Sequence, residues 1–235
     1  MNAYVGPVLD RYLSRLEQRL QEAGYGGPVL IILSHGGVAP IAEAIRLAAA
    51  MALSGPAGGV AGARYASRLM EAPNLIPFDM GGTSTDISLI SGGEPTLSAD
   101  RGIADQRIAL QALDIASIGA GGGSLASVDA GGLLKVGPES AGADPGPACY
   151  GHGGTQATVT DASAVLGFFD PANFLGGSTR LDAQAAEAAL DRLAGELGVA
   201  REQAAEGVHR VINTQMAEGV RLVSVRRGID PRQRR

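Results

Sequence analysis

The sequence predicts an α/β protein in which helices pack against a mixed sheet. Three observations support this class. Residues 2–22 show the apolar spacing of an amphipathic helix, short β-branched runs follow between 29 and 99, and helical spacing returns at 181–223. Hydrophobic residues form 45% of the 235-residue chain, which is enough for a core in one large or two small domains.

The first part of the chain predicts helices around one strand. The opening helix places leucines on one face at three- and four-residue spacing, and a glycine-rich stretch ends it. The run Val29–Leu33 is continuously apolar, which is typical of a strand covered on both faces. An alanine-rich helix is expected over 41–53. A further helix follows the loop 54–59 and ends near Glu71.

Residues 75–90 predict a β-hairpin with a chemically active tip. Apolar and β-branched residues flank a turn of two glycines and three hydroxyl residues, and the glycines leave the backbone open to a ligand. Successive amides and hydroxyl groups form a pocket for an anion, and phosphate is the anion that fits best. The predicted cofactor-binding residues of this turn are Gly81, Gly82, Thr83, Ser84 and Thr85.

Two acidic residues flank the same turn. Asp79 and Asp86 would repel a bare phosphate, so their position makes sense if a hard divalent cation or an ordered water separates them from phosphoryl oxygens. The turn therefore predicts nucleotide triphosphate chemistry with Mg²⁺. Asp79 and Asp86 are the candidate catalytic residues, and Asp79 is the candidate metal ligand. The alternative is an ordinary polar turn, because short glycine motifs also match by chance.

Glycines also mark the turns that follow. Gly92-Gly93 predicts a turn into a third strand at Pro95–Ala99, and 125–136 predicts a further hairpin. Between them lies a second set of backbone donors, which are candidate cofactor-binding residues: Gly121, Gly122 and Gly123. A flexible lid without a ligand would explain this loop equally well.

The segment 137–154 is a long loop rich in glycine and proline, and its modest polarity argues for order. Cys149 and His152 raise the hypothesis of a nucleophile and its base, but residues three apart in an irregular loop provide no catalytic geometry. His35 follows the first strand, where ligands collect in α/β folds; an ordinary loop histidine is the alternative.

The remainder is predicted to be helical. Asp161 is the predicted N-cap of a short helix that ends at Leu166. Helices are then expected over 181–197 and 199–223. The apolar face of the last helix has no later segment to cover it, which suggests a missing partner element.

Charge and composition exclude several classes of protein. The net charge is −5, and the last ten residues hold five Arg and one Asp, so the rest of the chain is more acidic still. That charge argues against nucleic-acid binding, and the arginine-rich end is expected to be a solvated tail. A single cysteine excludes an internal disulfide framework and favours the cytoplasm. The apolar runs are far shorter than a membrane span, so membrane anchoring is not expected.

Several long motifs in order carry a resemblance that covers essentially the whole chain. The sequence resembles the hydantoinase A/5-oxoprolinase family at Ser54–Val60, Phe78–Asp86, Ile118–Ser124, Val136–Gly151, Val159–Ala162 and Phe174–Gly177.

This resemblance implies an actin-like ATPase fold made of two ribonuclease-H-like halves, one of which is this chain with its Gly/Pro-rich loop insertion and C-terminal helices. It implies ATP and Mg²⁺ as cofactors, a cyclic amide such as 5-oxoproline or a hydantoin as substrate, and phosphorylation of the amide oxygen before water opens the ring. In that mechanism Asp79 positions Mg²⁺ or the attacking species, Asp86 orients the loop, and Gly81, Gly82 and Thr83 hold phosphate. The implied partners are a hydantoinase B-type subunit or domain and a second copy of the chain.

The sequence also departs from the family pattern. A first half with its own phosphate loop is expected before Met1, and a glycine-rich adenine-contacting segment after 225–231. His35 replaces the usual Asn, and His152 replaces a common Arg. The chain is thus expected to be one truncated domain with portions 1–72, 73–180 and 181–235. The alternatives are a ketone carboxylase subunit and a catalytically silent fragment.

Overall fold

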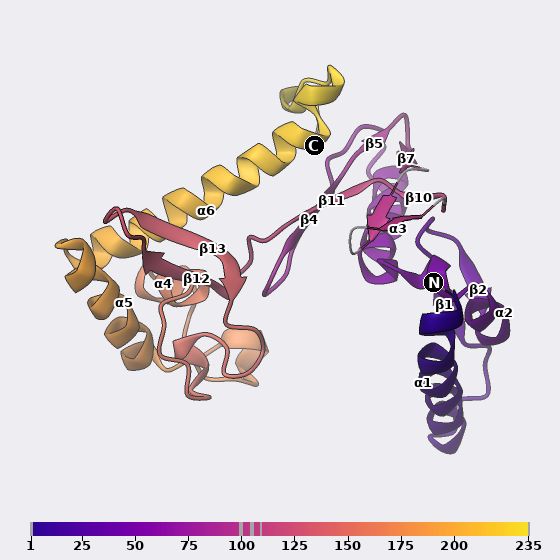
Figure 1. Ribbon diagram of the computed structural model, residues 1–235, viewed down its shortest axis with the longest axis horizontal. Helices are drawn as coiled ribbons and strands as arrows, with labels where there is room; N and C mark the ends of the chain where they lie inside the picture. The colour runs from indigo at the N-terminus through magenta and orange to yellow at the C-terminus, as the bar shows by residue number, and fades with distance from the viewer. Residues whose placement is uncertain (1, 99–100, 104–105, 109, 235) are drawn as a thin grey trace. The chain divides into compact units, whose positions relative to one another are not determined.

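The computed structural model describes residues 2–98, 101–103, 106–108 and 110–234 (Figure 1). Backbone contacts group the chain into two compact units. Unit 1 comprises Met1–Pro77, Ser88–Ile115 and Arg232–Arg235, and unit 2 comprises Phe78–Ile87 and Ala116–Pro231. These limits differ from the predicted portions, because the predicted phosphate hairpin lies in a unit with segments far from it in the sequence.

Both units combine helices with strands, so the predicted α/β class is confirmed. The predicted mixed sheet was wrong, because the strands of the described residues pair in separate sheets of two or three strands. Most of these strands have only two to four residues, which is too short to build one wide sheet.

Unit 1 contains two longer helices, α1 and α3, and a series of short hairpins. Its first core packs Leu13 of the opening helix against Leu33 and Ile41. The elements are α1 (Asn2–Glu22), β1 (Leu30–Ile32), β2 (Val38–Pro40), α2 (Ile41–Arg46), η1 (Ala48–Met51), α3 (Ser54–Leu69), β5 (Ile90–Ser91), β6 (Glu94–Pro95), β7 (Leu97–Ser98), β8 (Arg101–Ile103), β9 (Gln106–Ile108) and β10 (Ala112–Leu113).

Three predictions for unit 1 were wrong in detail. The loop expected at 54–59 is already helical, because α3 begins at Ser54. β1 is not covered on both faces: it pairs antiparallel with β2, and Leu30 is 51% exposed. The chain reverses at once because the amide of Leu33 donates to Gly37 O at 2.8 Å and Gly36 adopts a positive φ of 84°. The helix expected over 41–53 is also interrupted, since α2 ends at Arg46 and a separate 3₁₀ turn follows.

The glycine turn after β5 follows the prediction. Gly92 and Gly93 both have positive φ, and β5 pairs antiparallel with β6 across them. The strand predicted at Pro95–Ala99 is divided between β6 and β7, and its last residue, Ala99, lies outside the described residues.

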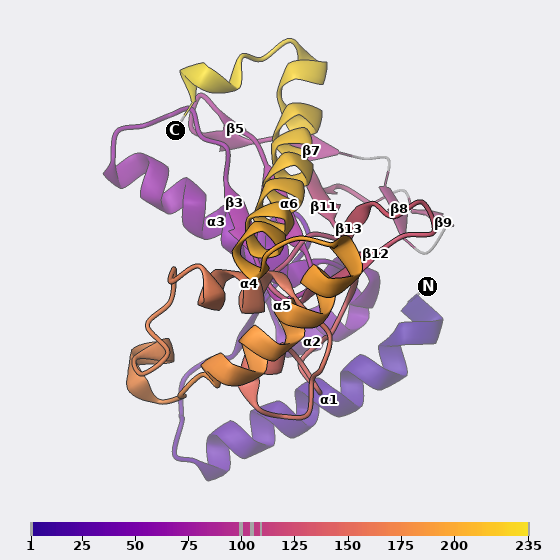
Figure 2. The ribbon, with the colours of Figure 1, turned by 90° about the vertical axis from the view of Figure 1, so that its left-hand side faces the viewer.

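Unit 2 has a helical layer, in which α4, α5 and α6 contact one another and the hairpin of β12 and β13 (Figure 2). The elements are β3 (Phe78–Met80), β4 (Thr85–Ser88), β11 (Ile115–Ile118), β12 (Ser124–Val128), β13 (Leu134–Ser140), η2 (Ala148–Tyr150), α4 (Val159–Val165), η3 (Phe174–Gly177), α5 (Ala183–Leu197), α6 (Arg201–Val223) and η4 (Val225–Arg227), with η5 (Pro231–Gln233) at the limit of the two units.

The apolar face of α6 is buried inside unit 2. Val208 and Ile212 are at most 1% exposed and belong to the main core with Leu190 of α5 and Val136 of β13. Segments that precede α6 in the sequence therefore cover this face. The prediction of a missing partner element for it was wrong.

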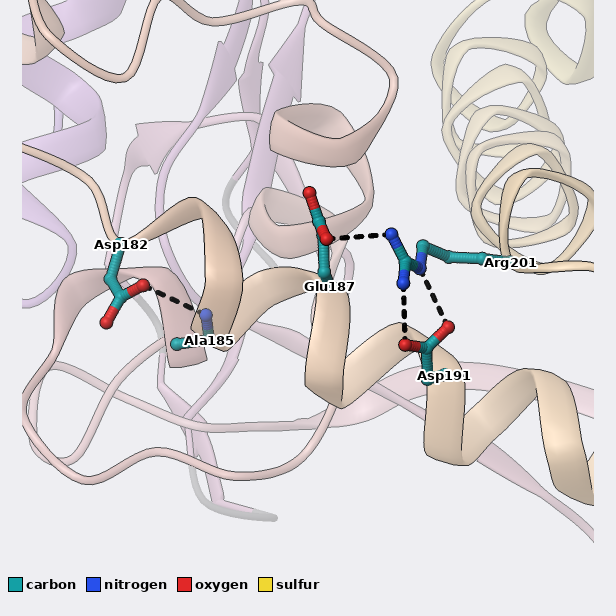
Figure 3. A network of polar contacts seen from close by, with 5 residues as sticks. All are labelled: Asp182, Ala185, Glu187, Asp191 and Arg201. Atoms are coloured by element: carbon teal, nitrogen blue, oxygen red, sulfur yellow. Dashed lines mark hydrogen bonds and ion pairs between the residues drawn. The ribbon is translucent and has the colours of Figure 1, made fainter.

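An ion-pair network fixes the start of α6 against α5 (Figure 3). The Arg201 guanidinium contacts Glu187 Oε2 at 2.8 Å and both oxygens of Asp191 at 2.7 Å. Hydrogen bonding to Arg201 lowers the pKa of the Asp191 carboxyl. In the same view Asp182 caps α5 by accepting from the amide of Ala185 at 3.0 Å.

The arginine-rich end is largely exposed, as expected for a solvated tail, but Arg234 contacts unit 1. Arg234 donates to Asn74 Oδ1 at 2.6 Å and to Ser91 Oγ at 3.2 Å within unit 1. Over the described ranges, no helix is both long and apolar enough to cross a membrane.

Candidate functional site

The predicted hairpin forms in unit 2, and its register places the two acidic residues opposite each other. β3 pairs antiparallel with β4, and Asp79 faces Asp86 across the ladder. Residues directly opposite in a ladder project from the same face of the sheet, so the two carboxylates are neighbours. Asp79 is exposed and Asp86 is half-buried. Both carboxylates are therefore accessible to a ligand.

Two neighbouring carboxylates suit a hard cation. Like charges directly opposite in a ladder destabilise it, and a divalent cation between them removes that repulsion. In the described part of the chain, no three His, Cys, Asp or Glu side chains gather into a ready-made metal cage. The pair fits Mg²⁺, which commonly takes one or two carboxylates and completes its shell with water and phosphate oxygens.

The tip between the strands presents backbone donors. The amide of Gly81 closes the turn by donating to Ser84 O at 2.8 Å. Gly82 and Thr83 are exposed, and no group among the described residues accepts a hydrogen bond from either amide. Consecutive unpaired amides form a concavity for an anion. The tip can thus contribute at least two donors to a phosphate.

The second glycine run supports this tip from behind. The amides of Gly122 and Gly123 donate to Gly81 O at 3.0 Å and Gly82 O at 2.6 Å. The amide of Gly121 donates to Ser124 Oγ at 2.8 Å. All three amides therefore have partners inside the protein. Their predicted contact with a cofactor stays a prediction, while their observed role is to position the hairpin.

Close approach explains why the second run is glycine, but not why the first is. A Cβ on Gly121 would lie 2.7 Å from backbone atoms of Gly82, whereas a Cβ on Gly82 would meet nothing within 4 Å. Gly82 also lacks a positive φ. Neither internal packing nor backbone strain requires a glycine at 82, so the open space beside it is available to a ligand.

These two glycines provide a matched pair of variants. We expect Gly121→Ala to destabilise the protein by about 1–3 kcal/mol, because the hairpin backbone must move away from the new methyl group. Gly82→Ala should leave stability unchanged or slightly higher, and should weaken binding of MgATP. Urea unfolding and calorimetric titration measure both effects. Equal loss of stability in the two variants would contradict this assignment.

The three hydroxyl residues of the turn lie in different surroundings. Thr85 is fully buried, and its Oγ1 donates to Ala120 O at 2.5 Å. Thr83 is exposed, and its Oγ1 lies 3.5 Å from Ser140 Oγ. Ser84 is half-buried. Thr85 thus anchors the hairpin, and Thr83 is the hydroxyl placed to meet a ligand.

Helix α6 supports the hairpin from its buried side. A Cβ on Gly219 would lie 2.6 Å from Ile87 Cδ1, so the helix backbone and β4 are in close contact. Ile87 is fully buried there. The carboxylate pair therefore stands on a packed base and not on a free loop.

A family model for hydantoinase/oxoprolinase matches residues 1–235. The chain belongs to the hydantoinase/oxoprolinase family. It is 42% identical to the caprolactamase subunit alpha of Pseudomonas jessenii over 233 residues, which cover 99% of this chain and 34% of that protein.

Two solved structures resemble this family member. A crystal structure of ATP-dependent caprolactamase from Pseudomonas jessenii matches with a TM-score of 0.81 at 41% identity, over 99% of this chain and 34% of that one. Nucleotide-free acetone carboxylase matches with a TM-score of 0.86 at 33% identity, over 94% and 31%. The chain thus spans about a third of the length of these relatives.

The sequence did not reveal that the carboxylate of Asp161 in this family member accepts several hydrogen bonds from buried groups. Thr158, and not Asp161, is the N-cap of α4, and the two residues form a capping box. Asp161 is fully buried and also accepts from the amides of Ala148 at 3.2 Å and Cys149 at 2.8 Å. The Thr-x-x-Asp spacing at 158–161 was the local signal for the capping box.

The geometry does not support a Cys149–His152 pair in this family member. Cys149 is fully buried, and burial together with the neighbouring Asp161 raises the pKa of its thiol. The thiol therefore stays protonated and is a poor nucleophile. His152 is exposed, whereas His35 uses its Nδ1 to accept from the amide of Gly37 at 3.1 Å.

Proposed function

We propose that the hairpin at 78–87 binds the polyphosphate of ATP with Mg²⁺ in an enzyme that opens a cyclic amide. The observation that carries this proposal is the facing pair Asp79 and Asp86 beside the unpaired amides of Gly82 and Thr83. Carboxylates alone would attract a cation, and amides alone an anion. Their combination suits a phosphate and its metal together.

Each group has a distinct task in this proposal. Asp79, the more exposed carboxylate, binds Mg²⁺. Asp86 orients the hairpin from β4, and its negative charge helps to neutralise the ion. The amides of Gly82 and Thr83 donate to phosphate oxygens. They stabilise the negative charge that shifts among these oxygens during phosphoryl transfer. Bound ATP would supply the phosphoryl group that activates the amide carbonyl toward water.

A cyclic amide is the substrate class that the relatives favour. The family description names hydantoinase and oxoprolinase, and the relative at 42% identity is a caprolactamase subunit. The second candidate is a ketone carboxylase subunit, which the structural match to acetone carboxylase favours. Both candidates need the same phosphate hairpin, so they differ in the group that receives the phosphoryl.

The wider assembly is part of the same proposal. We expect the chain to form one ribonuclease-H-like half of an actin-like ATPase cleft in a cytoplasmic enzyme. The matched caprolactamase chain is named as a subunit, which supports a partner subunit for this protein as well. A hydantoinase B-type subunit and a second copy of the chain are the proposed partners in this assembly.

Substrate-stimulated ATP hydrolysis tests the function in the complete protein. We expect 5-oxoproline, a hydantoin or caprolactam to raise the rate at least about tenfold. Stimulation by acetone with bicarbonate, and by none of the rings, would instead support the carboxylase. No stimulation by any of these compounds would refute both. Calorimetric titration of MgATP into the 235-residue chain tests the silent-fragment alternative, which submillimolar binding would exclude.

A further inference from the structure

A small cavity of mixed polar and apolar lining lies in unit 1, away from the phosphate hairpin in the sequence. Its volume is about 160 Å³, and its polar lining includes His35, Arg64, Tyr65 and Arg68. The last three side chains come from one face of α3, since residues three and four apart on a helix are neighbours. Ligand pockets for drug-sized molecules are larger, so the cavity selects a small group.

The lining carries more positive than negative charge. Arg64 Nη2 lies 2.5 Å from Glu94 Oε1, and Arg68 Nη2 lies 3.8 Å from the same oxygen. One carboxylate therefore serves two guanidinium groups. Their mutual repulsion on the helix is only partly neutralised, and an anion in the cavity would neutralise the rest.

His35, in the loop between β1 and β2, adds a donor to the lining of the cavity. Its Nδ1 accepts from the amide of Gly37, and this hydrogen bond assigns the proton of the neutral ring to Nε2. The imidazole lines the cavity, so it can present an N–H to an oxygen atom there. The cavity then holds donors of two residue types and a net positive charge.

We infer that this cavity binds a small oxyanion, either a carboxylate or a phosphate group, through Arg64, Arg68 and His35. A planar guanidinium suits both, because its parallel N–H groups match two oxygens of either anion. The site is independent of the proposed phosphate hairpin and needs no metal ion.

Calorimetric titration of inorganic phosphate and, separately, of acetate into the Mg²⁺-free chain tests the inference. We expect saturable one-site binding of at least one anion, and the anion that binds identifies the source. Arg64→Lys keeps the charge but removes the planar guanidinium and its parallel N–H groups, so it should weaken binding at least about tenfold. Arg68→Gln should weaken it less. Arg46→Gln, whose guanidinium pairs with Glu43 on α2, is the matched control and should change nothing.

Failure of both anions to saturate would overturn the inference, as would unchanged binding by Arg64→Lys. Unchanged binding by Arg64→Lys would mean that the anion binds elsewhere, for example at the phosphate hairpin. The variant therefore distinguishes the cavity from the hairpin. Thermal unfolding shows whether each variant is folded. If Arg64→Lys does not fold, Arg68→Gln decides the question, because Arg68 is largely exposed and its change should spare the fold.

Discussion

Asp79→Asn should lower ATP-dependent turnover of the complete protein at least about 100-fold, without loss of stability. The amide keeps the shape of the side chain but removes the charge that would hold Mg²⁺. It also removes one of two like charges that face each other across β3 and β4. The apo chain should therefore be as stable as the parent or slightly more stable.

Steady-state hydrolysis and thermal unfolding measure the two effects. Asp10→Asn changes an exposed aspartate on α1 and serves as the charge control, which should retain full turnover. A parallel loss of stability and activity in Asp79→Asn would indicate a structural role. Full activity with intact stability would remove the residue from the proposed metal site.

The parts of the fold predicted well are those specified by neighbouring residues. Gly92-Gly93 needs only its own positive φ angles to make a turn, and the bounds of α1 follow from its own periodicity. The apolar run at 29–33 was misassigned because such a run does not reveal its pairing partner. Only the turn at Gly36 shows that β1 returns at once to β2.

The sequence predicted which residues form the candidate site, but not which distant residues hold it in place. The facing aspartates follow from a hairpin whose register is symmetric about Gly82 and Thr83, and the sequence contains all of its residues. That the amides of Gly122 and Gly123 hold the tip is a contact across forty residues. No local spacing encodes such a contact. For the same reason the burial of Asp161 against loop amides could not be foreseen.

Asp161→Ala should be the most destabilising single change in unit 2, with a loss of about 3 kcal/mol or more. The carboxylate accepts from Thr158 Oγ1 at 2.8 Å and from the amides of Ala148, Cys149 and Thr158. All of these donors belong to buried residues, so water cannot replace the lost acceptor. Each would be left without its observed partner at this position.

Asp129→Ala is the matched control for this loss. Asp129 also accepts from two backbone amides, those of Gly131 and Leu133, but it lies in an exposed turn. Water can take over both hydrogen bonds there, so the change should cost only a small part of the loss at 161. Urea unfolding of both variants measures the difference, and equal losses would contradict a burial effect.

The same substitution should reach the phosphate hairpin. Thr160, beside Asp161 in the first turn of α4, donates to Gly122 O through both its amide and its Oγ1 at 2.8 Å. Gly122 in turn donates to Gly81 O. A loosened helix start would free this chain of contacts, so amide hydrogen exchange at 121–123 should accelerate in Asp161→Ala. Unchanged exchange there, despite lower stability, would show that the hairpin is held independently of the buried carboxylate.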